Sequence, residues 1–211
     1  KNTMAFMDVD MAAAIVITSH QIADELKIPV HKRIYLQGWG YAKESPYIAQ
    51  RAELFHSPAM RSACEQAFAM AGKEMADIDF LDIYSCFASN VNFTRDILGI
   101  ADDDPRPLTV TGGLPYFGGP GNNYTTHSIA AMVELLRANR GSSGLVTGVG
   151  MHMTNHSFAI YSSVPQDINK VSPCRTDNTS VEITARADYG PAVIVGYTVV
   201  HTKTDQYALA V

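Results

Sequence analysis

Residues that could do chemistry gather around a predicted strand end and a histidine pair. Tyr84, Ser85 and Cys86 are consecutive and follow the apolar run at 78–84. Polar groups at a strand-to-helix switch face the edge of a sheet where ligands bind. A nearby helix N-terminus would activate the cysteine, whereas a small buried thiol is the ordinary alternative.

Three histidines are further candidates. His152 and His156 have the spacing of an H-E-x-x-H zinc motif, but Met153 stands where the motif has its glutamate. The pair also lies between strand-like runs, and a zinc site needs a third ligand. We therefore predict no metal site and expect one of the two as a site residue, with satisfied structural histidines as the alternative. His127 lies on the first turn of a predicted helix, facing either a cleft or solvent.

A glycine-rich segment precedes that helix. It holds Gly112, Gly113, Gly118, Gly119 and Gly121 within ten residues. Backbone amides without a Cβ approach ligands closely, and a helix N-terminus favours negative charge, which suits a phosphate, carboxylate or thioester oxyanion. The spacing matches neither a P-loop nor a dinucleotide fingerprint. A tight crossing between packed elements is the alternative.

The elements that must position these residues follow from apolar patterning. We expect strands at 13–18, 33–39, 78–84, 144–149 and 156–163. We expect helices at 18–26, 58–71, 87–98 and 124–140, where a Ser57-Pro58 start and stops at Gly72 and Gly99 are typical signals. This order predicts an α/β fold, a layered mixed sheet covered by helices.

Composition excludes several classes of protein. The 211 residues are 46% hydrophobic and 18% charged with a net charge of −5, which predicts a folded chain and argues against a nucleic-acid binder. The run Met11–Ile17 is too short to span a bilayer. Three cysteines are too few for a disulfide framework. This favours a reducing compartment, so we expect a cytoplasmic protein. Because a strand-like run follows Lys1 closely, we expect the sequence to start inside a larger protein.

Four landmarks, in this order, resemble the C-terminal half of the thiolase superfamily. Asp10–Val16 (DMAAAIV) resembles the family's D-G-A-A-A-L-V strand. Ile83–Phe87 (IYSCF) falls where family members have N-E-A-F or H-D-C-F, and Gly112–Pro120 is similar to G-G-x-x-x-x-G-H-P. Gly144–Ser163 falls on the last strand pair, around the C-x-G loop. The resemblance is strongest to type-1 thiolase-like proteins and acetyl-CoA acetyltransferases with an added C-terminal domain.

The resemblance also implies a domain organisation. Residues 1–40 would be the end of the thiolase N-terminal half, and 41–165 the C-terminal domain. Residues 166–211 would be a linker and the start of a β-rich, OB-like extension, with strands at 181–185, 192–201 and 206–211.

What the resemblance implies is Claisen chemistry on coenzyme A thioesters by two cysteines, a histidine and backbone amides. The nucleophile belongs to the N-terminal half. Gly119 stands where G-H-P has its histidine, Val149 stands near the proton-transfer cysteine, and Tyr84 replaces the asparagine. We therefore expect a thiolase-like acyltransferase that acts on or binds acyl-CoA thioesters, with thiolysis by the usual residues absent or very weak.

On this basis the expected catalytic residues are Tyr84, His127 and His156. The expected substrate-binding residues are Ser85, Cys86, Gly118, Gly119, Gly121, Asn122, Asn123 and His152. A coenzyme A thioester would be substrate or ligand, with no permanently bound cofactor. The expected partners are an acyl-CoA or lipid-derived thioester, the N-terminal thiolase half, and a second copy or partner subunit.

Two alternatives stay open. One is a β-hydroxyacyl-CoA lyase that uses Tyr84 as base, as is thought of a tyrosine near this position in related thiolase-like aldolases. A tyrosine is a weak base at neutral pH unless its pKa is lowered. The other is a non-catalytic module that binds coenzyme A or lipid.

Overall fold

The computed structural model describes residues 4–167, 190–191, 193–194 and 196–210. Its main unit is a four-stranded mixed sheet with the order β1-β4-β3-β2. The strands are β1 (Tyr35–Lys43), β2 (Phe80–Asp82), β3 (Ser143–Gly150) and β4 (Asn155–Ser162). β2 runs parallel to β3, while β4 is antiparallel to both β3 and β1. The predicted layered α/β fold is confirmed.

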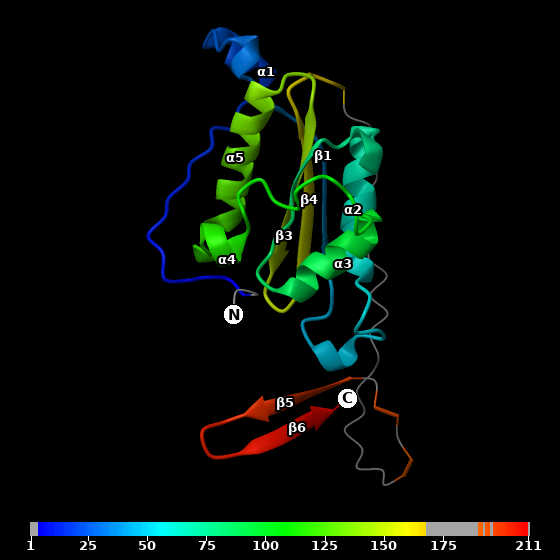
Figure 1. Cartoon of the computed structure of the whole chain (residues 1–211). Helices are drawn as coiled ribbons and strands as arrows, with labels where there is room; N and C mark the ends of the chain where they lie inside the picture. The colour runs from blue at the N-terminus through cyan, green and yellow to red at the C-terminus, as the bar shows by residue number, and fades with distance from the viewer. Residues whose placement is uncertain (1–3, 168–189, 192, 195, 211) are drawn as a thin grey trace.

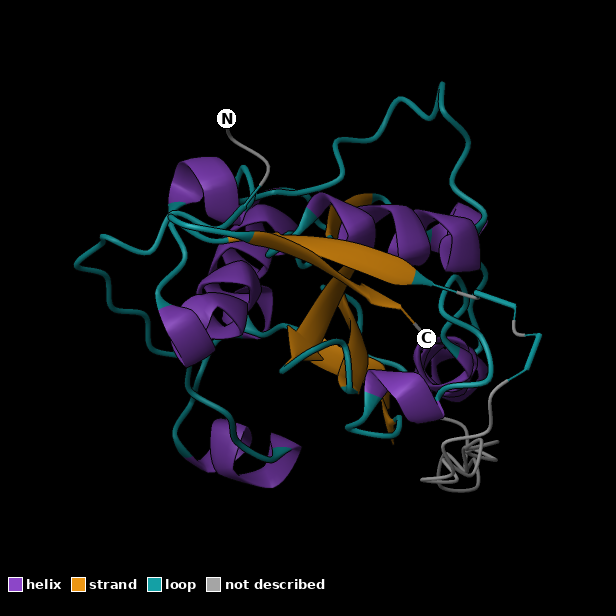
Figure 2. Ribbon diagram, turned by 90° about the horizontal axis from the view of Figure 1, so that it is seen from below, coloured by secondary structure: helices purple, strands orange, loops and turns teal. Residues whose placement is uncertain are grey.

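Helices cover both faces of this sheet, as Figure 1 and the view from below in Figure 2 show. α2 (Pro58–Ala71) packs on β1 and β4, and α5 (Tyr124–Ala138) packs on β3 from the other side. α3 (Ala88–Leu98) contacts α2. The remaining helical segments are short: α1 (His20–Glu25), α4 (Leu114–Phe117), η1 (Val30–Lys32), η2 (Ile48–Gln50), η3 (Met75–Asp77) and η4 (Gly121–Asn123).

Local signals set both ends of α2 and the end of α3 where the sequence predicts them. The Ser57 hydroxyl accepts a hydrogen bond from the Met60 amide at 3.0 Å and caps α2, with proline in the first turn. Gly72 and Gly99 end α2 and α3 with φ values of 60° and 65°, a conformation that glycine adopts without a Cβ penalty.

The alternation of side chains along the strands divides the interior between the two faces. Leu81, Leu145, Phe158 and Ile160 belong to the larger core cluster, which includes the buried residues of α2. Phe80, Val146 and Tyr161 pack instead in a second cluster with Met132 and Leu136 of α5. Successive strand residues therefore face different helices, as a period of two requires.

The contact between β1 and α2 is unusually close. A Cβ added to Gly38 would lie 2.1 Å from the Ala67 carbonyl oxygen, and one added to Gly40 would lie 1.9 Å from that of Ala63. Glycines on the strand and alanines on the helix thus let the two backbones approach each other.

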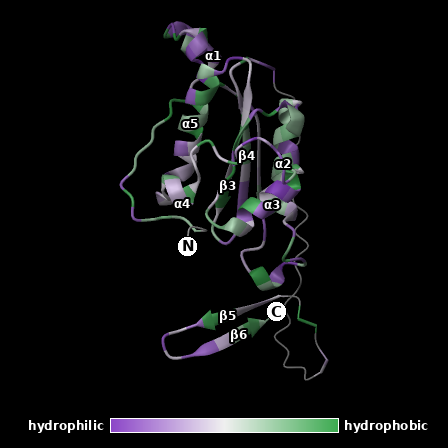
Figure 3. Ribbon diagram, in the orientation of Figure 1, coloured by the Kyte–Doolittle hydropathy of each residue, from purple (hydrophilic) through white to green (hydrophobic). Residues whose placement is uncertain are grey.

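The predicted strand at 13–18 is wrong. Residues 5–19 form neither helix nor strand, and Val16 and Ile17 are 91% and 86% exposed. An apolar extended segment becomes a strand only when it pairs with a neighbour, and this one joins neither edge of the described sheet. Figures 1 and 3 show it as a long, partly hydrophobic trace outside α5.

Other expected elements differ mainly in their ends. β1 starts and ends later than the predicted strand at 33–39, and β2 covers only the middle of the one at 78–84. In the C-terminal region, β5 (Tyr197–His201) and β6 (Gln206–Ala210) form an antiparallel pair of their own. The predicted strand at 181–185 lies outside the described residues. Across the part of the chain that the structure describes, no helix is long and apolar enough to cross a membrane.

Candidate functional site

The candidate site lies where β2 and β3 end, beside the N-terminus of α5. Since the two strands are parallel, their carboxyl ends meet at one edge of the sheet. The Tyr84 amide donates to the Thr147 hydroxyl on β3 at 2.9 Å, which fixes the chain just beyond β2. The side chain of Asn90 on α3 donates to the Tyr84 carbonyl oxygen.

A buried carboxylate organises the floor of this edge. Asp82 accepts hydrogen bonds from the amides of Val110 and Thr111 at 3.0 Å, and from the hydroxyls of Thr111 and Ser128 at 2.9 and 2.7 Å. The Thr111 hydroxyl also lies 2.6 Å from the Tyr124 hydroxyl. Asp82 therefore connects β2, the loop before the glycine-rich segment, and α5.

Aromatic rings line the α5 side of the site. Tyr84 meets Tyr124 edge to face, with ring centroids 5.4 Å apart. Phe117 of the glycine-rich segment lies against Tyr124 and His127, with centroids 6.1 and 5.5 Å away. His127 is buried, and its Nε2 lies 3.3 Å from the side-chain nitrogen of Asn123. The structure thus brings together Tyr84, His127 and Asn123 around one aromatic group.

Burial raises the pKa of the phenol and thiol groups of the site. Desolvation raises the pKa of the Tyr84 phenol, and the neighbouring Cys86 raises it further. Desolvation likewise raises the pKa of the Cys86 thiol, although a hydrogen bond from the Phe87 backbone opposes it. The pKa of Tyr124 rises to about 12 through burial and the charge of Asp82. At neutral pH these groups are neutral hydrogen-bond donors.

The glycine-rich segment packs under the N-terminal residues. A Cβ on Gly118 would lie 2.7 Å from the Met11 sulfur. The Gly119 amide donates to the Phe6 carbonyl oxygen at 2.7 Å, and the Gly121 amide donates to Gly119 at 2.8 Å. Several amides that the sequence suggests for a ligand are therefore already bonded within the chain. Gly121 and Asn122 are exposed.

Ser85 is part of the same packing. Its hydroxyl accepts a hydrogen bond from the Leu114 amide at 3.0 Å, and a Cβ on Gly113 would lie 2.8 Å from this hydroxyl. The Gly112 and Gly113 amides donate to the hydroxyls of Thr109 and Thr111. Ser85 therefore anchors the glycine-rich segment beside Cys86.

The structure does not bring His156 together with Tyr84 and His127. His156 follows the alternation of β4 and points to the α2 face with Phe158, whereas Tyr84 and His127 lie on the α5 face. Its Nε2 lies 3.0 Å from the Met153 carbonyl oxygen and 3.3 Å from the Ser57 hydroxyl. Burial lowers the pKa of His156, although the carboxylate of Glu44 opposes this.

His152 is exposed on the turn after β3. Its carbonyl oxygen accepts a hydrogen bond from Arg51 at 2.9 Å. Among the described residues no group of three or more His, Cys, Asp and Glu side chains is arranged to hold a metal ion.

The sequence analysis did not identify five residues that surround Tyr84 or His156 in the structure: Glu44, Arg51, Asp82, Thr111 and Tyr124. Only Asp82 carried a usable signal, because its spacing of two from Tyr84 on a strand places both on one face. The others act across long sequence separations, such as the 101 residues between Arg51 and His152.

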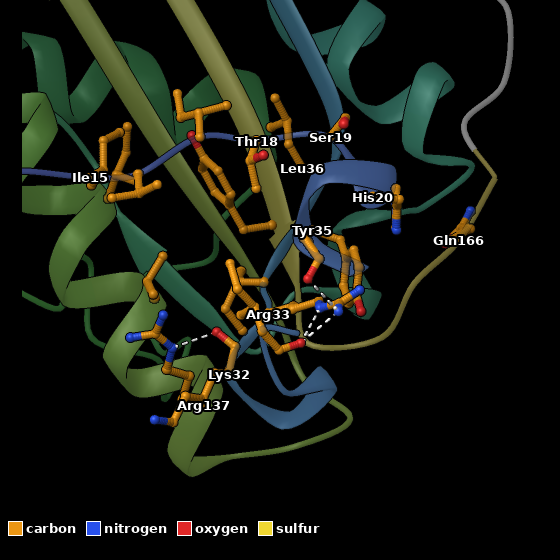
Figure 4. Close-up of a pocket in the computed structure, with 18 residues that line it drawn as sticks. Ile15, Thr18, Ser19, His20, Lys32, Arg33, Tyr35, Leu36, Arg137 and Gln166 are labelled. Atoms are coloured by element: carbon orange, nitrogen blue, oxygen red, sulfur yellow. Dashed lines mark hydrogen bonds between the residues drawn. The ribbon is translucent and has the colours of Figure 1, made fainter. Parts of the chain in front are cut away.

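A separate cavity of about 440 Å³ lies at the opposite end of the sheet, between α1, α5 and the start of β1 (Figure 4). Two of its cationic side chains are bonded to the backbone around it. Arg33 donates to the Ile28 carbonyl oxygen and pairs with Asp24 at 2.6 Å, and Arg137 donates to the Lys32 carbonyl oxygen at 2.9 Å. Both guanidinium groups therefore stabilise the fold around the cavity.

Comparison with known proteins identifies relatives of the chain. Residues 40–105 match the family described as thiolase C-terminal domain-like. The acetyl-CoA acetyltransferase 2 of Arabidopsis thaliana is 29% identical over 136 residues, which cover 64% of this chain and 31% of that protein. The chain therefore spans about a third of that relative's length.

Solved structures give the same picture. A monomeric SCP2-thiolase-like protein type 1 from Mycobacterium smegmatis is 37% identical with a TM-score of 0.82, over 90% of this chain and 43% of that one. The human mitochondrial 3-ketoacyl-CoA thiolase is 17% identical with a TM-score of 0.53, over 69% of this chain and 34% of that one, which is a likeness of fold.

Proposed function

We propose a function from one premise: the chain belongs to the thiolase superfamily and corresponds to the C-terminal half of its fold. It contributes the thioester-binding edge of a thiolase-like acyltransferase that acts on or binds acyl-CoA. In this edge the chain supplies neutral hydrogen-bond donors, and thiolysis by the usual histidine and cysteine is absent or very weak.

The observation that carries the proposal is the grouping of hydrogen-bond donors around Tyr84 at the carboxyl ends of β2 and β3. A thioester carbonyl oxygen accepts hydrogen bonds, and a partly buried phenol and thiol offer donors in surroundings of low polarity. Tyr84 and Cys86 are both half-buried at the carboxyl ends of the parallel strands, beside the buried His127. Such an edge suits binding and polarisation of a thioester.

Two further positions support the absence of the usual proton chemistry. A Cβ on Gly119 would lie 3.0 Å from the Cβ of Ala5 and 3.3 Å from the Phe6 carbonyl oxygen, so a histidine there would need the N-terminal segment to move. Val149 packs against the core cluster beneath α2. Neither residue can transfer a proton.

The raised pKa of Tyr84 counts against the lyase alternative. A general base works best with a pKa near the operating pH, and desolvation moves this phenol away from that range. A module that binds thioesters without turnover is compatible with neutral donors, and the experiment below separates it from an acyltransferase.

Calorimetry with acetyl-CoA on the intact protein tests the binding. Replacing Tyr84 with phenylalanine removes one donor, which is worth about 1 kcal/mol or about fivefold in the dissociation constant. Tyr116→Phe is the matched control, because Tyr116 is 75% exposed on the glycine-rich segment. Equal affinity in wild type and Tyr84→Phe would remove Tyr84 from the site, and no heat with any thioester would refute the proposal.

Turnover is measured separately on the same protein. We expect no robust cleavage of acetoacetyl-CoA by coenzyme A, and rapid cleavage would contradict the assignment of Gly119 and Val149 as inactive positions. Acyl transfer from acetyl-CoA to another acceptor would support the acyltransferase, whereas binding without any transfer would support the non-catalytic module.

A further inference from the structure

The turn that joins β3 to β4 contains two strained residues. Met151 and Met153 have φ values of 54° and 55°, in the left-handed region that residues with a Cβ rarely adopt. Such residues persist where the surrounding structure holds them in place. The turn, residues 151–154, follows β3, whose Thr147 accepts the hydrogen bond from the Tyr84 amide, so the turn lies at the same end of the sheet as the candidate site.

Three hydrogen bonds from other elements hold the carbonyl groups of this turn. Arg51 donates to His152 at 2.9 Å, His156 donates to Met153 at 3.0 Å, and the Glu44 amide donates to Thr154 at 2.9 Å. Every carbonyl oxygen from residue 152 to residue 154 thus has a donor outside the turn.

The two side-chain donors are themselves fixed by a buried ion pair and a helix cap. The Arg51 guanidinium lies 3.4 Å from the Glu44 carboxylate, and both side chains are largely buried. The Ser57 hydroxyl donates to Glu44 at 2.5 Å and lies 3.3 Å from His156 Nε2. We call Glu44, Arg51, Ser57 and His156 the turn clamp.

The contacts of the His156 ring show which of its two nitrogens donates a hydrogen bond. A carbonyl oxygen only accepts, so Nε2 carries the proton that bonds Met153, and Nδ1 carries none. Nδ1 is buried and has no hydrogen-bond partner in the described part of the chain. A buried ring nitrogen without a partner destabilises the fold. The hydrogen bond from Nε2 to the strained turn offsets this cost.

We propose that Arg51 and His156 are positioning residues, which through the turn clamp hold residues 151–154 in the shape that the thioester-binding edge requires. This inference rests on the function proposed above. Met151 is 80% exposed and His152 is also exposed on this turn, at the carboxyl end of β3. The turn clamp thus sets how these two side chains are presented to an acyl-CoA thioester.

The test compares variants of the intact protein by hydrogen exchange of the 150–155 peptide. His156→Leu and Arg51→Met each remove a donor, and we expect exchange in this peptide to rise about fivefold, as the loss of one hydrogen bond predicts. Peptides from α5 should be unchanged. His156→Gln keeps an N–H donor and should restore protection, which a loss of packing alone would not do.

Arg137→Met is the matched control, since Arg137 also donates to a backbone carbonyl oxygen but lies at the other end of the sheet. Unchanged turn exchange in both donor variants, or an equal rise in Arg137→Met, would overturn the turn clamp. A uniform rise in all peptides would do so too, because it would mean global destabilisation.

Acetyl-CoA binding is measured on the same variants. We expect about tenfold weaker binding in His156→Leu and Arg51→Met, with recovery in His156→Gln. A loosened turn with unchanged affinity would refute the positioning role and leave the proposed function standing. If wild type binds no thioester, the proposed function fails and the positioning role fails with it, while the exchange data still decide whether the turn clamp holds the turn.

Discussion

Tyr84 and His156 behave differently because each is surrounded by different groups. Tyr84 lies half-buried among aromatic rings, and its pKa rises, so it stays a donor. His156 is fully buried beside Glu44 and Arg51, and desolvation lowers its pKa. Both residues are neutral at neutral pH, but Tyr84 is half-buried at the candidate site, whereas His156 is bonded to the Met153 carbonyl oxygen of the turn.

The lowered pKa of His156 predicts a pH dependence of stability. The unfolded chain binds a proton near pH 6.5 and the folded chain resists it, so the free energy of unfolding should fall as pH drops from 6.5 towards 5. The charged groups that contact or face the ring, Glu44 and Arg51, oppose each other: the carboxylate raises the pKa and the guanidinium lowers it.

Urea unfolding of wild type and His156→Gln at pH 5, 6, 7 and 8 measures this dependence. Glutamine keeps a donor for Met153 but does not titrate, so the difference between the two proteins should shrink or reverse in favour of the variant at low pH. A difference that stays constant across this pH range would show that His156 does not resist protonation in the folded state.

At the scale of elements, the packing of β1 against α2 requires glycine at two positions of the strand. Gly38 and Gly40 face backbone carbonyl oxygens of α2 at distances that leave no room for a Cβ. This close approach positions Ser57 at the start of α2 near Glu44 beyond the end of β1. The turn clamp therefore depends on the fit between these two elements.

Gly40→Ala should be severely destabilising. Its Cβ would lie 1.9 Å from a backbone oxygen, which cannot turn aside as a side chain can, so we expect a loss of about 3 kcal/mol in the free energy of unfolding. Urea unfolding measures it. Gly190→Ala is the control, because no atom of the described residues lies within 4 Å of its added Cβ. Near-wild-type stability of Gly40→Ala would mean that β1 and α2 are farther apart.

At the scale of the whole molecule, Asp82 joins segments that are distant in sequence. It is fully buried, and its carboxylate accepts four hydrogen bonds. Three come from residues 110–111 and one comes from Ser128 of α5. The candidate site lies next to this junction, so its shape depends on one fully buried carboxylate.

Asp82→Asn should therefore loosen both the fold and the site. The asparagine side chain has no charge, and its NH₂ group would face N–H and O–H groups that themselves donate. We expect a loss of about 2 to 3 kcal/mol in the free energy of unfolding and weaker acetyl-CoA binding. Asp102→Asn is the control, because that carboxylate is fully exposed in its ion pair with Arg95. Equal stability of Asp82→Asn and wild type would contradict this role.

Much of the fold follows from sequence patterns. The ends of α2 and α3 were predictable because caps such as Ser57 and αL glycines such as Gly72 act within four residues. The candidate site was only partly predictable. Tyr84, Cys86 and His127 do lie at one edge, but the roles of all the predicted site residues stay predictions. The grouping of His156 with them does not hold, because its position on β4 turns it to the other face.

The sequence by itself determined both ends of α2, the end of α3, the layered α/β class and the thiolase resemblance, since each depends on neighbouring residues or on the order of short motifs. Only the tertiary structure decided that residues 13–18 remain unpaired, that Asp82 gathers its four donors, and that Arg51 reaches the turn at His152. The physical reason is that strand pairing, burial and long-range hydrogen bonds depend on which distant segments meet, and no local pattern specifies that.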